Sequence, residues 1–212
     1  MSVKPIFFAL DGKHLDNFSR ELEILKGNIY GVKVGLEMFT SEGPSSVEKL
    51  KKDGWTVFLD LKLHDIPNTV QAAAISAGNI GADYLTIHIA SGKEALLAAK
   101  ESKSENLKLL GVSTALTSKA YSPEISQRVY EEFLLAKESK IDGVICPPSE
   151  LFKTKELFEL IVTPGIRLKN DDSHDQKNIT TPEKAIRDGA SYLVMGRSIR
   201  QNINYVVEKL KL

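Results

Sequence analysis

Cysteine is almost absent from this chain, because Cys146 is the only one among 212 residues. A single cysteine excludes an intramolecular disulfide framework and a cysteine-rich zinc site. Net charge is lacking too, because 28 Lys and Arg residues balance 28 Asp and Glu residues. A neutral chain has no overall field to attract nucleic acid or an anionic membrane surface. We therefore expect no nucleic-acid partner, and any anion must be bound by a local cluster of side chains.

Long apolar runs are missing as well. The apolar run near the N-terminus covers only residues 6–10 and ends at Asp11. It is too short for a secretory signal and indicates a first buried strand. No stretch approaches the roughly 18 apolar residues that a transmembrane helix needs. We therefore expect no membrane partner and a cytoplasmic location for a chain whose 42% hydrophobic content is ordinary for a soluble protein.

Short apolar segments alternate with longer amphipathic ones along the whole chain. The apolar segments predict strands over residues 6–11, 30–34, 56–61, 84–88, 108–113, 143–146, 160–163 and 192–195. The amphipathic segments predict helices over residues 15–26, 42–53, 67–80, 92–102, 122–139, 149–157, 182–188 and 198–210. Ser198 is expected to be the N-cap of the last helix.

Strand–helix units of this kind, joined by short turns, are typical of parallel βαβ connections. No linker, low-complexity tract or change in composition divides the chain, so residues 1–212 are expected to form a single compact domain. An open doubly wound sheet is the alternative, but no GxGxxG motif follows the first strand. The count of eight strands favours the α/β class with a closed (β/α)8 TIM barrel.

Charged residues lie where the first three predicted strands end, and the catalytic groups of a barrel lie at those carboxyl ends. Asp11 ends the first strand, and Lys33 interrupts the apolar second strand. Asp60 and Lys62 are two positions apart, so they share one face of the third strand. Because a buried lysine is costly without a nearby carboxylate, Asp60 and Asp65 are the expected partners of both lysines. An ion-pair network with a purely structural role is the alternative.

Two turns that contain glycine and arginine follow the last two predicted strands. Residues 163–167 are Thr-Pro-Gly-Ile-Arg, and Gly196 and Arg197 follow the eighth strand. In barrels these two loops, with a helix N-terminus, form a recurring phosphate site. A guanidinium offers a planar fork to phosphate oxygens, and a glycine lets the backbone approach. A surface arginine beside a tight turn is the alternative interpretation.

Residues 60–70, Asp-Leu-Lys-Leu-His-Asp-Ile-Pro-Asn-Thr-Val, resemble the signature of the orotidine 5′-phosphate decarboxylase family. Segments 9–11, 32–35, 116–118, 163–167 and 195–197 also match that family in order and spacing. The resemblance covers nearly the whole chain, and this combination is highly specific, although Asp-x-Lys-x-x-Asp alone is not. It implies a carbon–carbon lyase of pyrimidine biosynthesis that converts orotidine 5′-monophosphate to uridine 5′-monophosphate and CO2 without a metal or an organic cofactor.

The resemblance also implies a role for each matching residue. Lys62 is the proton donor to the pyrimidine carbon that loses its carboxylate, and Asp60 lies against that carboxylate. Lys33 holds Asp60 and the ribose, and Asp65 completes a Lys-Asp-Lys-Asp array. The remaining substrate contacts are Asp11 at the ribose hydroxyls, Thr117 at the pyrimidine, Thr69, and Arg167, Gln176, Gly196 and Arg197 at the phosphate.

A homodimer is a further implication, in which Asp65 and Thr69 reach into the pocket of the neighbouring subunit. The polar segment 168–178 is expected to close over the ligand as a lid, although residues 168–172 depart from the family pattern.

A sister activity is the main alternative. Sugar-phosphate decarboxylases and hexulose-phosphate synthases share the barrel and the Asp-x-Lys-x-x-Asp motif but use Mg²⁺ and an enediolate. Residues 64–69 resemble the orotidine branch instead, and Lys33 would compete with a cation for the same carboxylates. A catalytically silent phosphate-binding barrel is a second alternative, but it should lack some member of the charged array, and none is missing.

Overall fold

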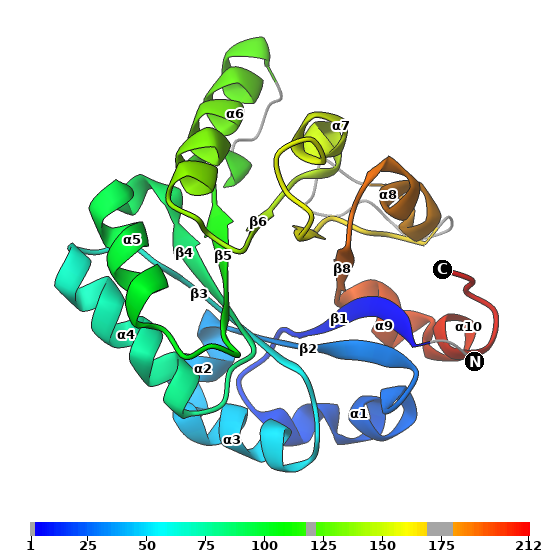
Figure 1. Ribbon diagram of the computed structural model, residues 1–212. Coiled ribbons are helices and arrows are strands. Elements are labelled where there is room, and N and C mark those ends of the chain that lie inside the picture. Colours follow the sequence, from blue (N-terminus) through cyan, green and yellow to red (C-terminus); the bar gives the residue numbers. More distant parts are fainter. Residues whose placement is uncertain (1–2, 118–121, 169–179) are drawn as a thin grey trace.

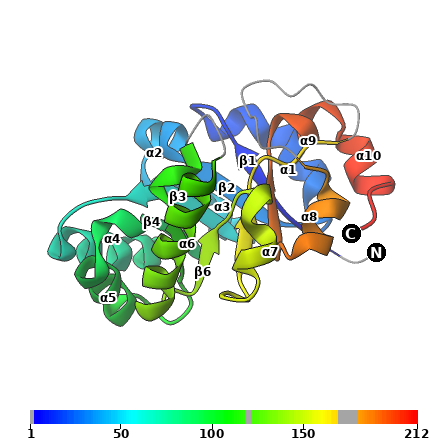
Figure 2. The same ribbon diagram turned by 90° about the horizontal axis from the view of Figure 1, so that it is seen from above.

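Eight parallel strands close into a barrel in the order β1 to β8, and helices surround it on the outside (Figures 1 and 2). The computed structural model describes residues 3–117, 122–168 and 180–212, with only the backbone of residues 116 and 117. The closed order of the eight parallel strands confirms the predicted (β/α)8 barrel. The strands are β1 Lys4–Leu10, β2 Ile29–Gly35, β3 Val57–Leu63, β4 Tyr84–His88, β5 Lys108–Val112, β6 Gly143–Ile145, β7 Ile161–Thr163 and β8 Tyr192–Met195.

The helices differ more from the prediction than the strands do. They are α1 Ser19–Leu25, α2 Leu36–Glu42, α3 Pro44–Lys52, α4 Pro67–Asn79, α5 Lys93–Ser102, α6 Pro123–Glu138, α7 Leu151–Thr154, α8 Pro182–Asp188, α9 Arg197–Gln201 and α10 Ile203–Glu208. Helix α2, which begins directly after β2, has no counterpart among the predicted helices. Pro44 starts a separate helix because proline suits the first helical position, where no N–H is needed.

The predicted helix over residues 198–210 is two helices, divided at Asn202. The prediction that Ser198 is an N-cap is wrong, because α9 begins at Arg197 and Gly196 is its N-cap. The Ser198 hydroxyl instead accepts a hydrogen bond from the Leu168 N–H at 3.2 Å. Ser198 thus ties the segment after β7 to the start of α9.

Two apolar cores stabilise the barrel. The larger one lies between the strands and the helices, and the smaller one fills the barrel interior around Phe7, Phe58 and Tyr84. Phe7 contacts Phe58 and Tyr84 edge to face, with ring centroids 5.4 and 5.2 Å apart. Gly31 makes room for this ring, because a Cβ there would lie 2.9 Å from Phe7. The interior is therefore packed below the charged residues of the strand ends.

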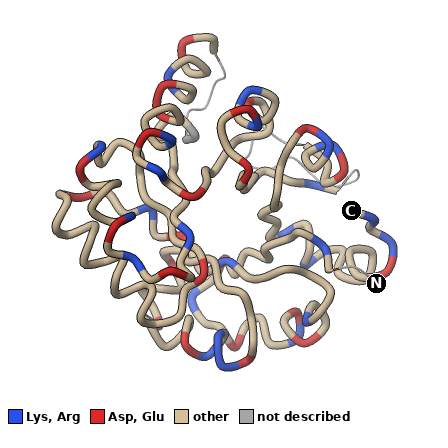
Figure 3. Tube along the Cα trace, in the orientation of Figure 1, with Lys and Arg blue, Asp and Glu red and all other residues tan. Residues whose placement is uncertain are grey.

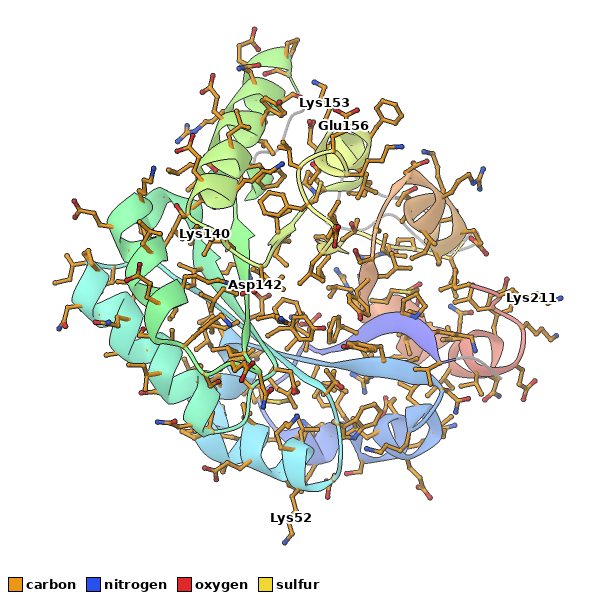
Figure 4. The ribbon with its side chains drawn as sticks, viewed as in Figure 1. Lys52, Lys140, Asp142, Lys153, Glu156 and Lys211 are labelled. Carbon is orange, nitrogen blue, oxygen red and sulfur yellow. The ribbon has the colours of Figure 1, made fainter. Side chains whose placement is uncertain are left out.

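Asp142 lies just before β6, at the amino end of the barrel strands (Figure 4), and takes part in an ion pair there. Its carboxylate accepts the Leu109 N–H at 2.9 Å and lies 2.7 Å from the Lys100 ammonium. Asp83 repeats this arrangement before β4, where it accepts the first N–H of β3. In contrast, Lys52 and Lys211 extend away from the barrel (Figure 4).

Charges of both signs are interspersed along the outer helices (Figure 3). Within the described ranges, no helix has the length and apolar character needed to cross a membrane.

Candidate active site

A cavity of about 390 Å³ lies at the carboxyl ends of the strands. This is the end of a (β/α)8 barrel where active sites are built. Charged and polar side chains line one part of it, and apolar residues of the inner strands line the rest. The lining residues are Ala9, Asp11, Lys33, Phe58, Asp60, Lys62, His88, Val112, Ile145, Pro164, Gly165, Arg167, Val194, Gly196 and Arg197.

The end of β3 carries a β-bulge that shapes the site. Leu59 pairs with Leu85, but the next pair is Leu63 with Ile87, so four steps along β3 match two along β4. Within the bulge Lys62 has a φ of 51°, which is unusual for a residue with a side chain. Bulges often lie beside active sites, where they change the direction of a side chain. The period-two pattern predicts that Asp60 and Lys62 share a face but does not predict this bulge.

A chain of ion pairs joins β3, β2 and the end of β1. The Lys62 ammonium lies 2.8 Å from Asp60 Oδ2, and the Lys33 ammonium lies 3.7 Å from the same oxygen. Lys33 is also 3.3 Å from Asp11 Oδ1. The side chains of Lys33 and Asp60 are only 11% and 13% exposed, so solvent screens the attraction between these two charges little.

Opposing effects set the pKa of Asp60. Burial raises it, but the charges of the Lys33 and Lys62 ammonium groups, with the hydrogen bonds that Lys62 and Thr86 donate, hold the pKa below its ordinary value. Asp60 is therefore ionised at neutral pH, as an electrostatic role requires.

Asp65 and Thr69 lie outside this cavity. Both are exposed, and the Asp65 carboxylate accepts the Ile66 N–H at 2.7 Å. The expectation that Asp65 pairs with a lysine of its own chain is therefore wrong. Lys33 takes Asp11 as its second carboxylate, because β1 and β2 are neighbours and Ala9 pairs with Lys33.

The two predicted phosphate-binding turns meet at the cavity, where Gly165, Arg167, Gly196 and Arg197 contribute to the lining. Arg167 is only 9% exposed, whereas Arg197 is exposed at the rim. A Cβ at Gly196 would lie 3.0 Å from Asp11 Oδ2, so glycine allows these two strand ends to approach. Gln176, residues 169–178 of the predicted lid and the Thr117 side chain lie outside the described residues.

Two polar residues of β4 join the charged cluster, although neither is among the residues predicted for the site. His88 ends β4 and lines the cavity. Burial lowers its pKa, and the nearby His64 lowers it further, so the ring is neutral at pH 7. Thr86, two residues before His88 on β4, is fully buried, and its hydroxyl donates a hydrogen bond to Asp60. Their only sequence signal is that residues 86 and 88 share the inward face of β4 with Tyr84.

The described residues contain no group of three or more His, Cys, Asp or Glu side chains placed to hold a metal ion. The polar groups of the cavity are instead ammonium, guanidinium, carboxylate and imidazole groups. A closed eight-stranded barrel with such a cavity defines the chain as a (β/α)8-barrel enzyme.

Comparison with known proteins assigns the family. The model of the Orotidine 5′-phosphate decarboxylase / HUMPS family matches residues 4–210, and the chain belongs to this family. It is 40% identical to the orotidine 5′-phosphate decarboxylase of Fusobacterium nucleatum, over 95% of this chain and 91% of that protein. Identity to the protein of the same name from Halalkalibacterium halodurans is 40%, with coverage of 93% and 92%.

Solved structures agree with this assignment. The orotidine 5′-phosphate decarboxylase of Lactobacillus acidophilus superposes with a TM-score of 0.76 at 31% identity, covering 93% of this chain and 92% of that one. An uncharacterized conserved protein from Geobacillus kaustophilus gives 0.76 at 32% identity, with coverage of 93% of each chain.

Proposed function

We propose that this enzyme removes CO2 from orotidine 5′-monophosphate to give uridine 5′-monophosphate, using Lys62 as the proton donor and no metal or organic cofactor. The observation that carries the proposal is the chain of ion pairs from Lys62 through Asp60 to Lys33 on the wall of the cavity. It occurs in a chain that is 40% identical to a protein named for this activity.

The chemistry requires residues of this kind. When the bond to the carboxylate breaks, CO2 leaves and its electron pair stays on a pyrimidine carbon that has no electron sink. A fixed ammonium beside that carbon stabilises the carbanion and then delivers a proton to it. Lys62 has this function in the proposal, and its hydrogen bond with Asp60 fixes the ammonium before the substrate arrives.

Asp60 has a second function in the same step. Its buried, ionised carboxylate disfavours the substrate carboxylate before CO2 leaves, and the preorganised array of charges is the larger contribution to the rate. Lys33 pairs with the same Asp60 oxygen as Lys62 and reaches Asp11, the proposed contact for the ribose hydroxyls.

The phosphate is assigned to the part of the cavity formed by the turns after β7 and β8. Arg167 and Arg197 line it there, together with Gly165 and Gly196. Two guanidinium groups supply the positive charge that a phosphate dianion needs in a chain with no net charge. Gln176 and a lid over residues 168–178 belong to the same proposal.

The array also favours chemistry without a metal ion over the Mg²⁺-dependent sister activity. The Lys33 ammonium lies 3.3 Å from Asp11 and 3.7 Å from Asp60, between the carboxylates that a divalent cation would bind. A cation at this position would be repelled by the ammonium.

We further propose a homodimer in which Asp65 and Thr69 complete the partner's site. Ile66, next to Asp65, is 66% exposed, and Leu36 after β2 is 53% exposed. A second subunit packed over the loop that carries Asp65 would bury the apolar surface of Ile66. A two-fold axis would bring each loop to the other pocket.

The test of the dimer is to refold Lys62→Ala and Asp65→Asn proteins together, each being nearly inactive alone. A mixed dimer then has one pocket with both changes and one with neither. Random pairing makes about half of the dimers mixed, so about a quarter of all pockets are intact and about a quarter of the wild-type activity returns. If mixed dimers form and no activity returns, Asp65 serves its own chain.

The test of the activity is to incubate the purified protein with orotidine 5′-monophosphate and follow the ultraviolet absorbance of the substrate. Formation of uridine 5′-monophosphate, identified by chromatography, supports the proposal, and an unchanged substrate contradicts it. The cytoplasmic location and the single domain over residues 1–212 stay predictions.

A further inference from the structure

The hydroxyl of Thr86 lies between two parts of the charged array. Thr86 Oγ1 donates a hydrogen bond to Asp60 Oδ1 at 2.9 Å and accepts one from the Lys62 N–H at 2.8 Å. The direction of both bonds is fixed, because an amide can only donate and an ionised carboxylate can only accept. Thr86 is fully buried, so solvent does not reach its hydroxyl.

Thr86 lies opposite the bulge of β3. It stands between Leu85 and Ile87, the two residues of β4 that keep their pairing on either side of the bulge. Regular pairing would satisfy the Lys62 N–H with a carbonyl of β4, but the bulge interrupts the ladder there. The side-chain hydroxyl takes over this role and holds Lys62 at its φ of 51°.

We propose that Thr86 is a positioning residue for the decarboxylation: its hydroxyl holds the ionised Asp60 carboxylate and the Lys62 backbone in the catalytic arrangement. Thr86 does not line the cavity, so it acts through these two residues and not on the substrate. The inference rests on the proposed function of the charged array.

Other groups around Asp60 also influence its ionisation and stay unchanged in the test. Lys33 on β2 and Lys62 on β3 lie against the carboxylate, and Asp11 is one ion pair further away. The ionisable side chains that line the rest of the cavity are His88, Arg167 and Arg197. A change at residue 86 therefore alters one hydrogen-bonding group among several fixed charges.

The substitution that isolates the hydroxyl is Thr86→Val, which keeps the shape of the side chain. We expect kcat to fall about 10- to 100-fold with little change in KM, because a hydrogen bond to a charged group is lost. Loss of this bond also raises the pKa of Asp60, so the acid limb of the pH–rate profile moves to higher pH. Thr86→Ser keeps the hydroxyl and should restore both properties.

A matched control is Thr154→Val on α7. Thr154 is 2% exposed, and its hydroxyl donates to the Glu150 carbonyl outside the cavity. It tests whether loss of any buried threonine hydroxyl slows the enzyme. The titration of the Asp60 carboxyl carbon, followed by ¹³C NMR in the free protein, gives a measurement that does not depend on turnover.

The inference is supported if Thr86→Val moves both the Asp60 titration and the rate while Thr86→Ser and Thr154→Val resemble the wild type. It is overturned if Thr86→Val leaves the Asp60 titration unchanged, or if Thr86→Ser is as slow as Thr86→Val. Should the wild type fail to decarboxylate the substrate, the proposed function fails, whereas the NMR titration still decides the role of Thr86.

Discussion

Replacing Lys33 with methionine removes a central charge of the array and keeps a side chain of similar length. The ammonium lies 3.7 Å from Asp60 Oδ2. At this distance the Coulomb energy is about 4.5 kcal/mol for an effective dielectric constant of about 20, and about 1 kcal/mol for water. Because both side chains are nearly buried and Lys62 still compensates Asp60, we expect a loss of about 2 kcal/mol in the stabilisation of the ionised carboxylate.

The pH dependence of stability measures this loss. Because the folded pKa of Asp60 is below its ordinary value, ionisation stabilises the fold above pH 4, and this contribution disappears as the pH falls through the folded pKa. Without Lys33 the folded pKa rises. The difference in the free energy of unfolding between wild type and Lys33→Met is therefore largest near pH 7 and shrinks in acid.

Urea denaturation at one protein concentration, repeated from neutral to acidic pH, is the assay. The control is Lys49→Met, which breaks a shorter ion pair with Asp16, 2.9 Å apart, whose side chains are 58% and 82% exposed. Solvent screens that pair, so we expect little change at any pH. An equal effect of both substitutions, or a Lys33→Met effect that does not vary with pH, would refute the reasoning.

Two further predictions concern the substrate and metal ions. Arg197→Ala should lower kcat/KM by about 3 kcal/mol for orotidine 5′-monophosphate, because a charge-assisted contact with the phosphate is lost. It should scarcely affect the slow reaction of the nucleoside, and an equal loss on both substrates would place Arg197 at the chemistry or in the fold. Dialysis against a chelator should leave the decarboxylation rate unchanged, and activity that requires added Mg²⁺ would assign the chain to the sister branch.

Local pattern was enough to predict the barrel. All eight strands lie where short apolar runs occur, within about two residues at each end, because a strand covered by helices must be apolar. Helix boundaries depend more on tertiary contacts. The apolar pattern of the sequence signals neither the break at Asn202 nor the separate helix α2. The hydrogen bond from the Leu168 N–H to Ser198 joins residues that are distant in sequence.

The candidate site was predictable to the extent that it follows strand ends. Lys33, Asp60 and Lys62 are charges within apolar strands, and this pattern alone marks them. The choice of Asp11 as the partner of Lys33 depends on the register between β1 and β2, which the sequence does not specify. Thr86 gave no signal because threonine is common in strands, and its function arises from a bulge on the neighbouring strand.

The most direct test of the account is the decarboxylation rate of Lys62→Ala with saturating orotidine 5′-monophosphate. Lys93→Ala is the control, because Lys93 pairs with Glu138 on the surface, where both side chains are more than half exposed. The account predicts that Lys62→Ala loses at least about 10³-fold in kcat while it stays folded, and that Lys93→Ala matches the wild type. A Lys62→Ala protein that decarboxylates within about tenfold of the wild-type rate would contradict the assignment of Lys62 as the proton donor.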